Sequence, residues 1–443
     1  MEATFLIEDL GQEGEGVGRS GGRVLFVPRT TVGDEVRARF PDDGKPYARA
    51  RLIEIVRPSP DRVTPECPLY EACGGCQTME LSYEAELRVK ERRLRDALQR
   101  LGGIARPPVE PIVAAPRTAH YRMKATMPAA PSAGGLIFGY YRRGSHHLVD
   151  VCDCTVLDPE VQRTANVIRD ALRQAGVPAW DEAGRRGVVR SLMVRRSHSG
   201  GGMQAVLTVT RPLAGDWARG VPEAQPLLTG LLVAVEPLVT NRLVGARPEV
   251  VWGEPMIREH LLGKTFRVSP TAFFQANPEM AEVLFASAAE AAGGEGTSLL
   301  DLYAGTGTLA ILLAEGRESV EGIEVVGAAV RDARANARLN GLTHVRFYAG
   351  EAAAVLRNRI AAGARYDTLT LDPPRKGAQE AVPLMLEAHP SRIIYVSCDP
   401  ATLARDVALL GQGGYTLVSA RPFDLFPRTV HVETLAVLER AHG

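Results

Sequence analysis

The sequence predicts an α/β protein, with a C-terminal Rossmann-like domain preceded by a small OB-like β-barrel and a central α+β domain. A chain of 443 residues is long enough for two or three domains that each bury a core. Apolar strands and helical segments alternate regularly after Ser269, which indicates a doubly wound parallel sheet. Glycine turns between short β-branched runs fill residues 1–57, a pattern typical of a small barrel.

Composition narrows the classes of function. Hydrophobic residues make up 45% and charged residues 23% of the chain, which is ordinary for a globular protein. The 52 basic residues balance the 52 acidic ones, so bulk positive charge cannot provide affinity for nucleic acid, although a local basic surface can. The sequence shows neither a secretory leader nor an apolar run of membrane-spanning length. We therefore expect a cytoplasmic protein with no membrane partner, and a monomer.

The first two domains are predicted from local sequence patterns. The barrel at residues 1–57 is a scaffold that often binds nucleic acid, although a barrel with no binding role fits the pattern equally well. The central domain is expected at residues 58–268. A helix is predicted at residues 81–103, because leucines recur at helical spacing before Gly102 and Gly103 end it. We expect this helix to pack on the C-terminal domain.

The third domain, residues 269–443, repeats a strand–helix unit. Strands are predicted at residues 298–305, 319–326, 345–351, 366–374, 392–398 and 432–440. Helices lie between them, for example at residues 327–341. In a doubly wound sheet the ligand binds at the carboxyl ends of the strands, so the residues that follow each strand are the candidate site.

A tight glycine loop follows the first of these strands, in the sequence DLYAGTGTLA. Gly305 and Gly307 permit a sharp turn and the close approach of a ligand. Glu324 ends the next strand, where a carboxylate can accept hydrogen bonds from both ribose hydroxyls, and Asp372 ends a later strand at a Pro-Pro corner. The loop has neither the dinucleotide nor the triphosphate signature, which favours a nucleoside ligand such as S-adenosylmethionine. Another ligand on a Rossmann-like domain remains the alternative.

A lone cysteine, Cys398, ends the strand after the one that carries Asp372, so its thiol is expected to face the same pocket. One reaction that needs a thiol beside a methyl donor is the methylation of carbon 5 of uracil. This carbon attacks a sulfonium methyl only after a thiolate has added to carbon 6, and a base must then remove the carbon 5 proton. Glu433 is the candidate base, and Arg375 and Arg428 are expected to lower the pKa of the thiol. A buried structural cysteine and a solvated glutamate are the alternatives.

Together these motifs resemble the RNA uracil-5-methyltransferase family, which makes 5-methyluridine in tRNA and ribosomal RNA. The resemblance covers nearly all of the chain. The segments VSCDPATLARD and HVETLAVL resemble the nucleophile and base motifs of the family, which implies Cys398 as nucleophile and Glu433 as general base. The resemblance also implies five residues that bind S-adenosylmethionine: Gln275 in SPTAFFQAN, Tyr303 and Thr308 in DLYAGTGTLA, and Glu324 and Asp372.

Three further cysteines, Cys67, Cys73 and Cys76, form the pattern C-x5-C-x2-C. Three thiolates at this spacing suit a metal site that needs one more ligand. A subgroup of the family carries a [4Fe-4S] cluster, and the resemblance implies Cys154 rather than Cys152 as the last ligand. A four-thiolate zinc site is the runner-up, because spacing alone does not separate the two metals. A disulfide is the least compatible with the cytoplasm.

The N-terminal barrel resembles the TRAM domain, which many of these enzymes carry for RNA binding. The central segment YRMKATM is also similar to the family, but Met123 stands where asparagine is usual. The resemblance implies S-adenosylmethionine-dependent methylation of uridine carbon 5, with 23S ribosomal RNA favoured over tRNA. The uridine is expected to flip out of its stack to reach the thiol. The same reaction on tRNA, cytosine-5 methylation and a non-catalytic RNA-binding or chaperone role are the alternatives.

Overall fold

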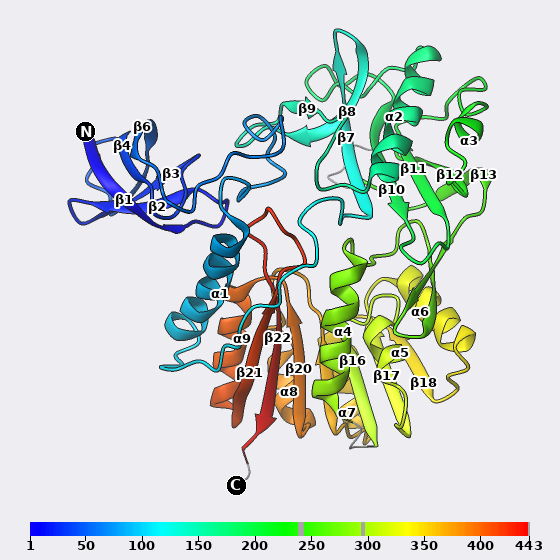
Figure 1. Ribbon diagram of the computed structural model, residues 1–443. Helices are drawn as coiled ribbons and strands as arrows, with labels where there is room; N and C mark the ends of the chain where they lie inside the picture. The colour runs from blue at the N-terminus through cyan, green and yellow to red at the C-terminus, as the bar shows by residue number, and fades with distance from the viewer. Residues whose placement is uncertain (238–242, 294–296, 442–443) are drawn as a thin grey trace.

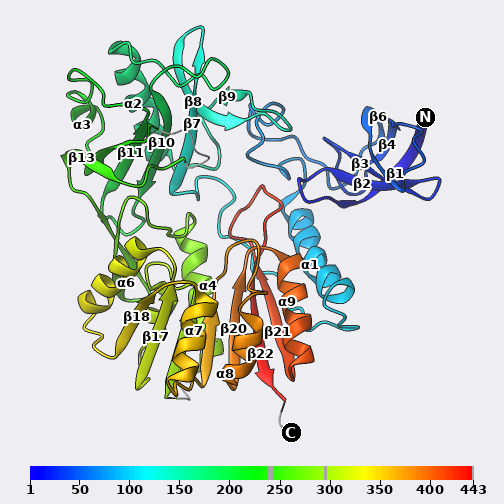
Figure 2. The ribbon, with the colours of Figure 1, turned by 180° about the vertical axis from the view of Figure 1, so that it is seen from behind.

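The computed structural model describes residues 1–237, 243–293 and 297–441, which form three large sheets in chain order. The N-terminal sheet lies to one side, beside one end of helix α1 (Tyr83–Arg100), and the central sheet lies above the C-terminal sheet (Figures 1 and 2). Among the described residues, no helix is long and apolar enough to cross a membrane.

The N-terminal sheet has six strands in the order β5-β3-β2-β1-β4-β6. Its strands are β1 (Glu2–Leu10), β2 (Gly16–Ser20), β3 (Arg23–Val27), β4 (Glu35–Arg39), β5 (Tyr47–Arg49) and β6 (Arg51–Arg57). Strand β1 pairs with β2 and with β4, and its register slips between Ile7 and Asp9. Such a bulge bends the strand, and alternate residues such as Phe5 and Ile7 then bury one small core.

The central sheet has seven strands in the order β13-β12-β11-β10-β7-β8-β9. Its strands are β7 (Lys124–Ser132), β8 (Gly135–Tyr141), β9 (Leu148–Asp150), β10 (Val189–Arg196), β11 (Met203–Val209), β12 (Gly230–Val235) and β13 (Pro248–Gly253). Helix α2 (Pro159–Gln174) packs on this sheet, and the short α3 (Val221–Ala224) contacts α2. Asp158 caps α2 by accepting from two backbone N–H groups of its first turn.

The C-terminal sheet has seven strands in the order β18-β17-β16-β19-β20-β22-β21. Its strands are β16 (Ser298–Leu302), β17 (Ser319–Glu324), β18 (Val345–Ala349), β19 (Thr368–Leu371), β20 (Arg392–Ser397), β21 (Tyr415–Phe423) and β22 (Glu433–Arg440). A hairpin of β14 (Ile257–Leu261) and β15 (Lys264–Val268) precedes it. Its helices are α4 (Pro278–Ala292), α5 (Thr308–Leu312), α6 (Gly327–Leu339), α7 (Ala352–Ala361), α8 (Val382–Ala388) and α9 (Pro400–Gln412).

The expectation of an entirely parallel sheet is wrong at one edge. Strands β16 to β20 are parallel to one another, but β22 runs antiparallel to β20 and β21 antiparallel to β22. The sequence pattern shows where a strand lies but not its direction, and β21 was not predicted at all. Because β22 is reversed, its first residue, Glu433, lies at the edge where the parallel strands end.

Helices cover both faces of this sheet. Apolar residues of α4, α5 and α6 share one core with one face of the strands, and those of α7, α8 and α9 share a second core with the other face. Leu299 and Leu300 belong to different cores, as expected when successive side chains of a strand point to opposite faces. The carboxyl edge of the strands is thereby held rigidly between two packed layers.

Helix α1 belongs to the second core although it precedes the central sheet in the chain. Leu94 and Leu98 are fully buried there, and α1 lies against α9 in both views (Figures 1 and 2). The leucine spacing that predicts this helix matches its buried face only in part. Leu101 is exposed, whereas Glu86 and Lys90 are buried. Helical periodicity places residues on a face but cannot reveal which charged residues meet a partner from another element.

We expect Lys90→Met to destabilise the fold strongly. The Lys90 ammonium is 1% exposed and lies 2.7 Å from Glu86 Oε1 and 2.6 Å from Asp424 Oδ1. Its removal leaves two buried carboxylates without their cation, which costs about 3–5 kcal/mol in free energy of unfolding. Urea denaturation measures this, with Lys264→Met as the control, because the exposed pair of Lys264 with Glu315 should contribute below about 1 kcal/mol. Equal losses in the two variants would contradict the prediction.

Candidate active site

A cavity of about 720 Å³ opens at the carboxyl edge of the C-terminal sheet. This is where a doubly wound sheet binds its ligand. The cavity is lined by all seven residues expected to act in catalysis or donor binding: Gln275, Tyr303, Thr308, Glu324, Asp372, Cys398 and Glu433. The structure therefore brings together residues that are more than 150 positions apart in the chain.

The glycine loop after β16 turns through left-handed backbone conformations. Tyr303, Gly305 and Gly307 have φ angles of 62°, 56° and 83°. A Cβ atom on Gly307 would lie 2.7 Å from Cζ of Phe347, so a larger residue at this position would collide with the core. The chain can thus pass directly from the strand into α5, and Ala304, Gly305 and Thr306 of the loop line the cavity.

Glu324 is held in place by the loop that it faces. Its Oε2 accepts a hydrogen bond from the Gly305 N–H at 3.0 Å, and its Oε1 accepts from the Val326 N–H at 2.7 Å. Each carboxylate oxygen keeps a second lone pair for another donor. The side chain is therefore oriented in advance for hydroxyl groups of a ligand in the cavity.

Cys398 and Glu433 come from neighbouring strands. Ser397, the last residue of β20, pairs with Thr434 of β22, so the residues that flank this pair lie at the same edge. Glu433 is 5% exposed and Cys398 is half-buried, and both line the cavity. A thiol and a carboxyl group thus face one space, as a covalent mechanism with a separate base requires.

Burial and acidic neighbours raise the pKa of Cys398 to about 11, with Glu433 and Asp372 the next largest causes. The expectation of a lowered thiol pKa is therefore wrong. Arg375 opposes the rise, but Arg428 has other partners: its guanidinium lies near Glu86 and Glu66 and over the Tyr83 ring. Distance in sequence did not reveal that the Arg428 guanidinium has these other partners.

The carboxyl groups of the site are also shifted. Burial, then the charge of Asp372, raises the pKa of Glu433 to about 8, and Arg375 opposes this rise. Burial alone raises the pKa of Asp372 to about 7. Carboxyl groups poised near neutral pH, at a cavity that also holds a thiol, are typical of catalytic sites.

Three lining residues were not identified as site residues from the sequence. Asp301 is fully buried at the end of β16, where it accepts from the Thr370 hydroxyl and the Ala310 N–H. The ring of His431 accepts from Arg375, whose Nη2 lies 3.2 Å from His431 Nε2. Arg122 reaches the cavity from the segment before β7 and lies over the Phe426 ring. All three lie within quoted motifs, Arg122 in YRMKATM, which was the available signal, but only the tertiary structure shows that Arg122 reaches this cavity.

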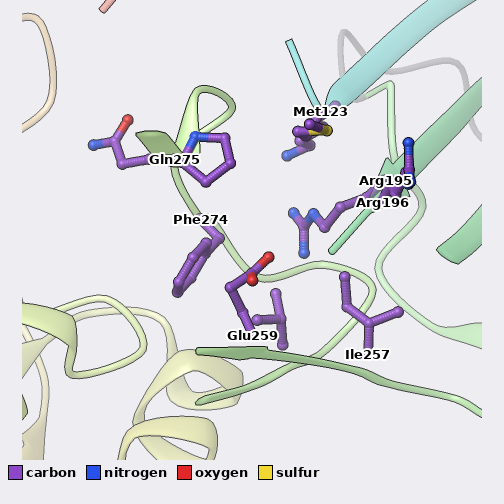
Figure 3. Close-up of a pocket in the computed structure, with 10 residues that line it drawn as sticks. Met123, Arg195, Arg196, Ile257, Glu259, Phe274 and Gln275 are labelled. Carbon is purple, nitrogen blue, oxygen red and sulfur yellow. The ribbon is translucent and has the colours of Figure 1, made fainter. Parts of the chain in front are cut away.

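The loop that carries Gln275 is anchored by the central sheet. The Arg195 guanidinium of β10 donates to the carbonyl oxygens of Ser269 and Ala272, and Figure 3 shows Arg195 and Glu259 around a small cavity beside Phe274 and Gln275. Met123, the departure from the family pattern, is buried at this junction and donates its N–H to the Ala276 carbonyl. The position therefore serves packing between the two sheets.

The four cysteines expected to bind a metal gather in one region. Cys67, Cys76 and Cys154 pack against one apolar cluster, and Cys73 lies within electrostatic reach of them. Burial, followed by the neighbouring thiols, raises the pKa of Cys76 to about 12. Within the described ranges, however, no three His, Cys, Asp or Glu side chains are placed so that they could hold a metal ion. The side-chain placement thus does not support the expected cluster. Cys152 is exposed, and its thiol lies 2.8 Å from Arg169 Nη1.

The fold and the cavity define a class of protein. A doubly wound sheet with a glycine loop, a carboxylate at the end of the second strand and a D-P-P strand end is the arrangement of Rossmann-like methyltransferases. The family model described as tRNA (Uracil-5-)-methyltransferase matches residues 257–441, and the TRAM domain model matches residues 2–53.

Relatives that match nearly the whole chain point to the same class of protein. A protein of Halalkalibacterium halodurans named as an uncharacterized RNA methyltransferase is 37% identical to this chain, and the match covers 98% of this chain and 96% of the relative. A protein of Gloeobacter violaceus with the same kind of name is 39% identical, and the match covers 99% of this chain and 96% of the relative. The structure of Pyrococcus abyssi tRNA (uracil-54, C5)-methyltransferase in complex with S-adenosyl-L-homocysteine superposes with a TM-score of 0.77 and 25% identity, covering 99% of this chain and 100% of that one. The chain belongs to the tRNA (uracil-5-)-methyltransferase family and is an RNA methyltransferase with an N-terminal TRAM domain.

Proposed function

We propose that this protein transfers a methyl group from S-adenosylmethionine to carbon 5 of a uridine in RNA, with Cys398 as nucleophile and Glu433 as general base. The observation that carries the proposal is the meeting of this thiol and this buried carboxyl group in the cavity of the glycine loop. A covalent thiol adduct would not be needed for methylation of a nitrogen or oxygen atom, because such an atom attacks the methyl group with its own lone pair.

The cavity suits S-adenosylmethionine as the methyl donor. We assign Glu324 to the ribose hydroxyls, because both of its oxygens are oriented and retain lone pairs. Gln275, Tyr303, Thr308 and Asp372 line the rest of the cavity and are proposed as further contacts. The complex of the Pyrococcus abyssi relative with S-adenosyl-L-homocysteine supports S-adenosylmethionine as the donor. When bound, the donor supplies an electrophilic methyl group.

The chain's own residues carry the remaining steps. The Cys398 thiolate forms a bond to carbon 6 of the uracil, and the electron pair of the carbon 5–carbon 6 double bond moves toward carbonyl oxygen 4. Carbon 5 becomes nucleophilic and accepts the methyl group as the sulfonium–methyl bond breaks, which leaves S-adenosylhomocysteine as the second product. Glu433 then takes the carbon 5 proton, the double bond re-forms and the sulfur–carbon 6 bond breaks, which releases the thiolate. Arg375, which opposes the rise in pKa of both groups, favours their charged forms.

The pKa of Glu433 predicts how the reaction depends on pH. A general base acts only when deprotonated, so below its pKa of about 8 the rate should fall about tenfold per pH unit. The single-turnover rate of release of methylated RNA, at saturating RNA and donor, should therefore lose this contribution above about pH 8, where only the rise that comes from the Cys398 thiol, with its pKa of about 11, should continue. Donor affinity, measured in parallel, should vary far less. A plateau that begins near the ordinary glutamate value of 4.5 would contradict the prediction.

For the RNA we propose 23S ribosomal RNA, with the TRAM domain and the central domain as the binding surfaces. In this division residues 1–57 and 58–268 bind RNA and residues 269–443 hold the chemistry. Transfer RNA is the second candidate, because the Pyrococcus abyssi relative is named for a tRNA position. Purified protein with labelled donor should be offered each unmodified RNA separately, and the nucleosides mapped by mass spectrometry. 5-Methyluridine in ribosomal RNA alone supports the proposal, label in tRNA alone selects the second candidate, and 5-methylcytidine would contradict the uracil chemistry.

The spacing of the cysteines and the family resemblance support a separate proposal, although the described residues show no side-chain arrangement ready to hold a metal ion. Cys67, Cys73, Cys76 and Cys154 would hold a [4Fe-4S] cluster, with zinc as the alternative, and no step of the methyl transfer passes through it. The proposal rests on the C-x5-C-x2-C spacing of the first three cysteines and on the half-buried position of all four. Anaerobically purified protein should be brown and contain iron and sulfide. A colourless protein with one equivalent of zinc would select the alternative, and a metal-free folded protein would refute both.

A further inference from the structure

The segment from Asp424 to His431 links β21 to β22 and leads directly into Glu433. Its backbone carbonyl groups accept hydrogen bonds from outside the C-terminal sheet. Lys90 of α1 donates to the Phe426 oxygen at 3.2 Å, and Asn277, the cap of α4, donates to the Leu425 oxygen at 2.9 Å. We refer to this segment, residues 424–431, as the base loop.

Residues 67–78, which contain Cys67, Cys73 and Cys76 and which we call the cysteine segment, provide two further hydrogen bonds to the base loop. The N–H groups of Gln77 and Thr78, which follow Cys76 directly, donate to the Arg428 carbonyl oxygen at 2.9 Å and 3.2 Å. The Tyr70 hydroxyl donates in turn to the Gln77 oxygen at 2.9 Å. The base loop is thus tied to a part of the chain about 350 positions earlier.

Tyr121 joins the same two regions through its side chain. Its ring is 1% exposed and packs with Tyr70, Met79 and Val156 in the apolar cluster that the cysteines also contact. Its hydroxyl donates to the Pro427 oxygen of the base loop at 2.9 Å. The Tyr121 ring is thus buried in the apolar cluster while its hydroxyl is hydrogen-bonded to the base loop, and this fixes the distance between the two regions.

We propose that Tyr121 is a positioning residue for the general base. Together with the backbone of Gln77 and Thr78, it holds the base loop against the cysteine segment, and the position of the loop in turn determines the position of Glu433. This inference rests on the proposed role of Glu433. A loop between two antiparallel strands is free to shift unless its backbone is held, and a catalytic group displaced by about 1 Å can lose roughly a hundredfold in rate. The cysteine segment thereby acts on the elimination step without touching the substrate.

Tyr121→Phe tests the inference, because it keeps the ring and removes only the hydrogen bond to Pro427. Tyr415→Phe is a matched control: its hydroxyl makes the same kind of buried bond, to the Pro390 oxygen at 2.6 Å, at the opposite edge of the sheet. We expect kcat in Tyr121→Phe to fall roughly ten- to a hundredfold, the covalent enzyme–RNA adduct to accumulate, and donor affinity to stay within about twofold. Tyr415→Phe should change none of these.

Hydrogen exchange gives a readout that does not depend on catalysis. Amides of residues 425–431 should exchange faster in Tyr121→Phe and be unchanged in Tyr415→Phe. Wild-type kcat and adduct levels in Tyr121→Phe would overturn the inference, even if exchange were faster. If the wild-type protein methylates no uridine, the proposed function fails, and unchanged loop exchange would then separately overturn the positioning role. Should Tyr121→Phe not fold, Tyr70→Phe removes a hydrogen bond from the same segment and must show the same pattern.

Discussion

Replacing Cys398 with alanine is expected to abolish methyl transfer while leaving donor binding intact. Without the thiol no bond forms to carbon 6, and carbon 5 of the uracil stays too weakly nucleophilic to accept the methyl group. Loss of a covalent nucleophile typically costs roughly 10⁴-fold or more in kcat. Single-turnover transfer of labelled methyl groups measures the loss, and calorimetry with S-adenosylhomocysteine should give a Kd within about twofold of wild type, because the donor contacts are retained.

Cys152→Ala is the matched control for this variant, because the Cys152 thiol is exposed and does not line the active-site cavity. It should keep wild-type transfer. If Cys398→Ala kept measurable turnover, the thiol would be structural, and the covalent mechanism would be wrong. If the inactive variant fully rescued a deletion phenotype, the binding of RNA rather than its methylation would be the function that matters in the cell.

The second large effect is expected from Glu433→Gln. Glutamine has nearly the same shape but cannot accept the carbon 5 proton, so addition and methyl transfer proceed while elimination stops. The enzyme should therefore remain bonded to its RNA, and the adduct should be visible as a slowly migrating band on denaturing gels. Turnover should fall by about 10²–10⁴-fold, the range of general-base catalysis.

Glu439→Gln provides the control from the same strand. Glu439 lies near the far end of β22 and pairs with Arg392 at 2.8 Å, well away from the cavity. It should neither trap RNA nor slow turnover. The double variant Cys398→Ala with Glu433→Gln should form no adduct, which identifies Cys398 as the bonded residue. An adduct that persists in the double variant, or full turnover of Glu433→Gln, would contradict the assigned roles.

The pKa values of the proposed nucleophile and base are shifted in the same direction. Burial disfavours the charged forms of both Cys398 and Glu433, and each acidic neighbour adds to the effect. A thiol with a pKa of about 11 is largely protonated at neutral pH, so adduct formation should depend on the charge that Arg375 brings to the site. Arg375 is in turn oriented by the ring of His431, whose pKa burial lowers to about 4 and which therefore stays neutral.

The sequence by itself determined the local elements and the candidate chemistry of the site. Strand–helix alternation, the glycine loop and the strand-end residues Glu324, Asp372 and Cys398 are short-range patterns, and each follows from the conformations that a few neighbouring residues permit. The parallel part of the sheet and the cavity at its carboxyl edge could be predicted for the same reason.

Only the tertiary structure decided the direction of β22, the burial of Lys90 and the surroundings of the thiol. A reversed strand has the same apolar pattern as a parallel one, so the position of Glu433 beside Cys398 depended on pairing between distant segments. The direction of the thiol pKa shift and the anchoring of the base loop by Tyr121 likewise depend on which groups meet in space. Desolvation and long-range hydrogen bonds are properties of the folded contacts, and no stretch of neighbouring residues encodes them.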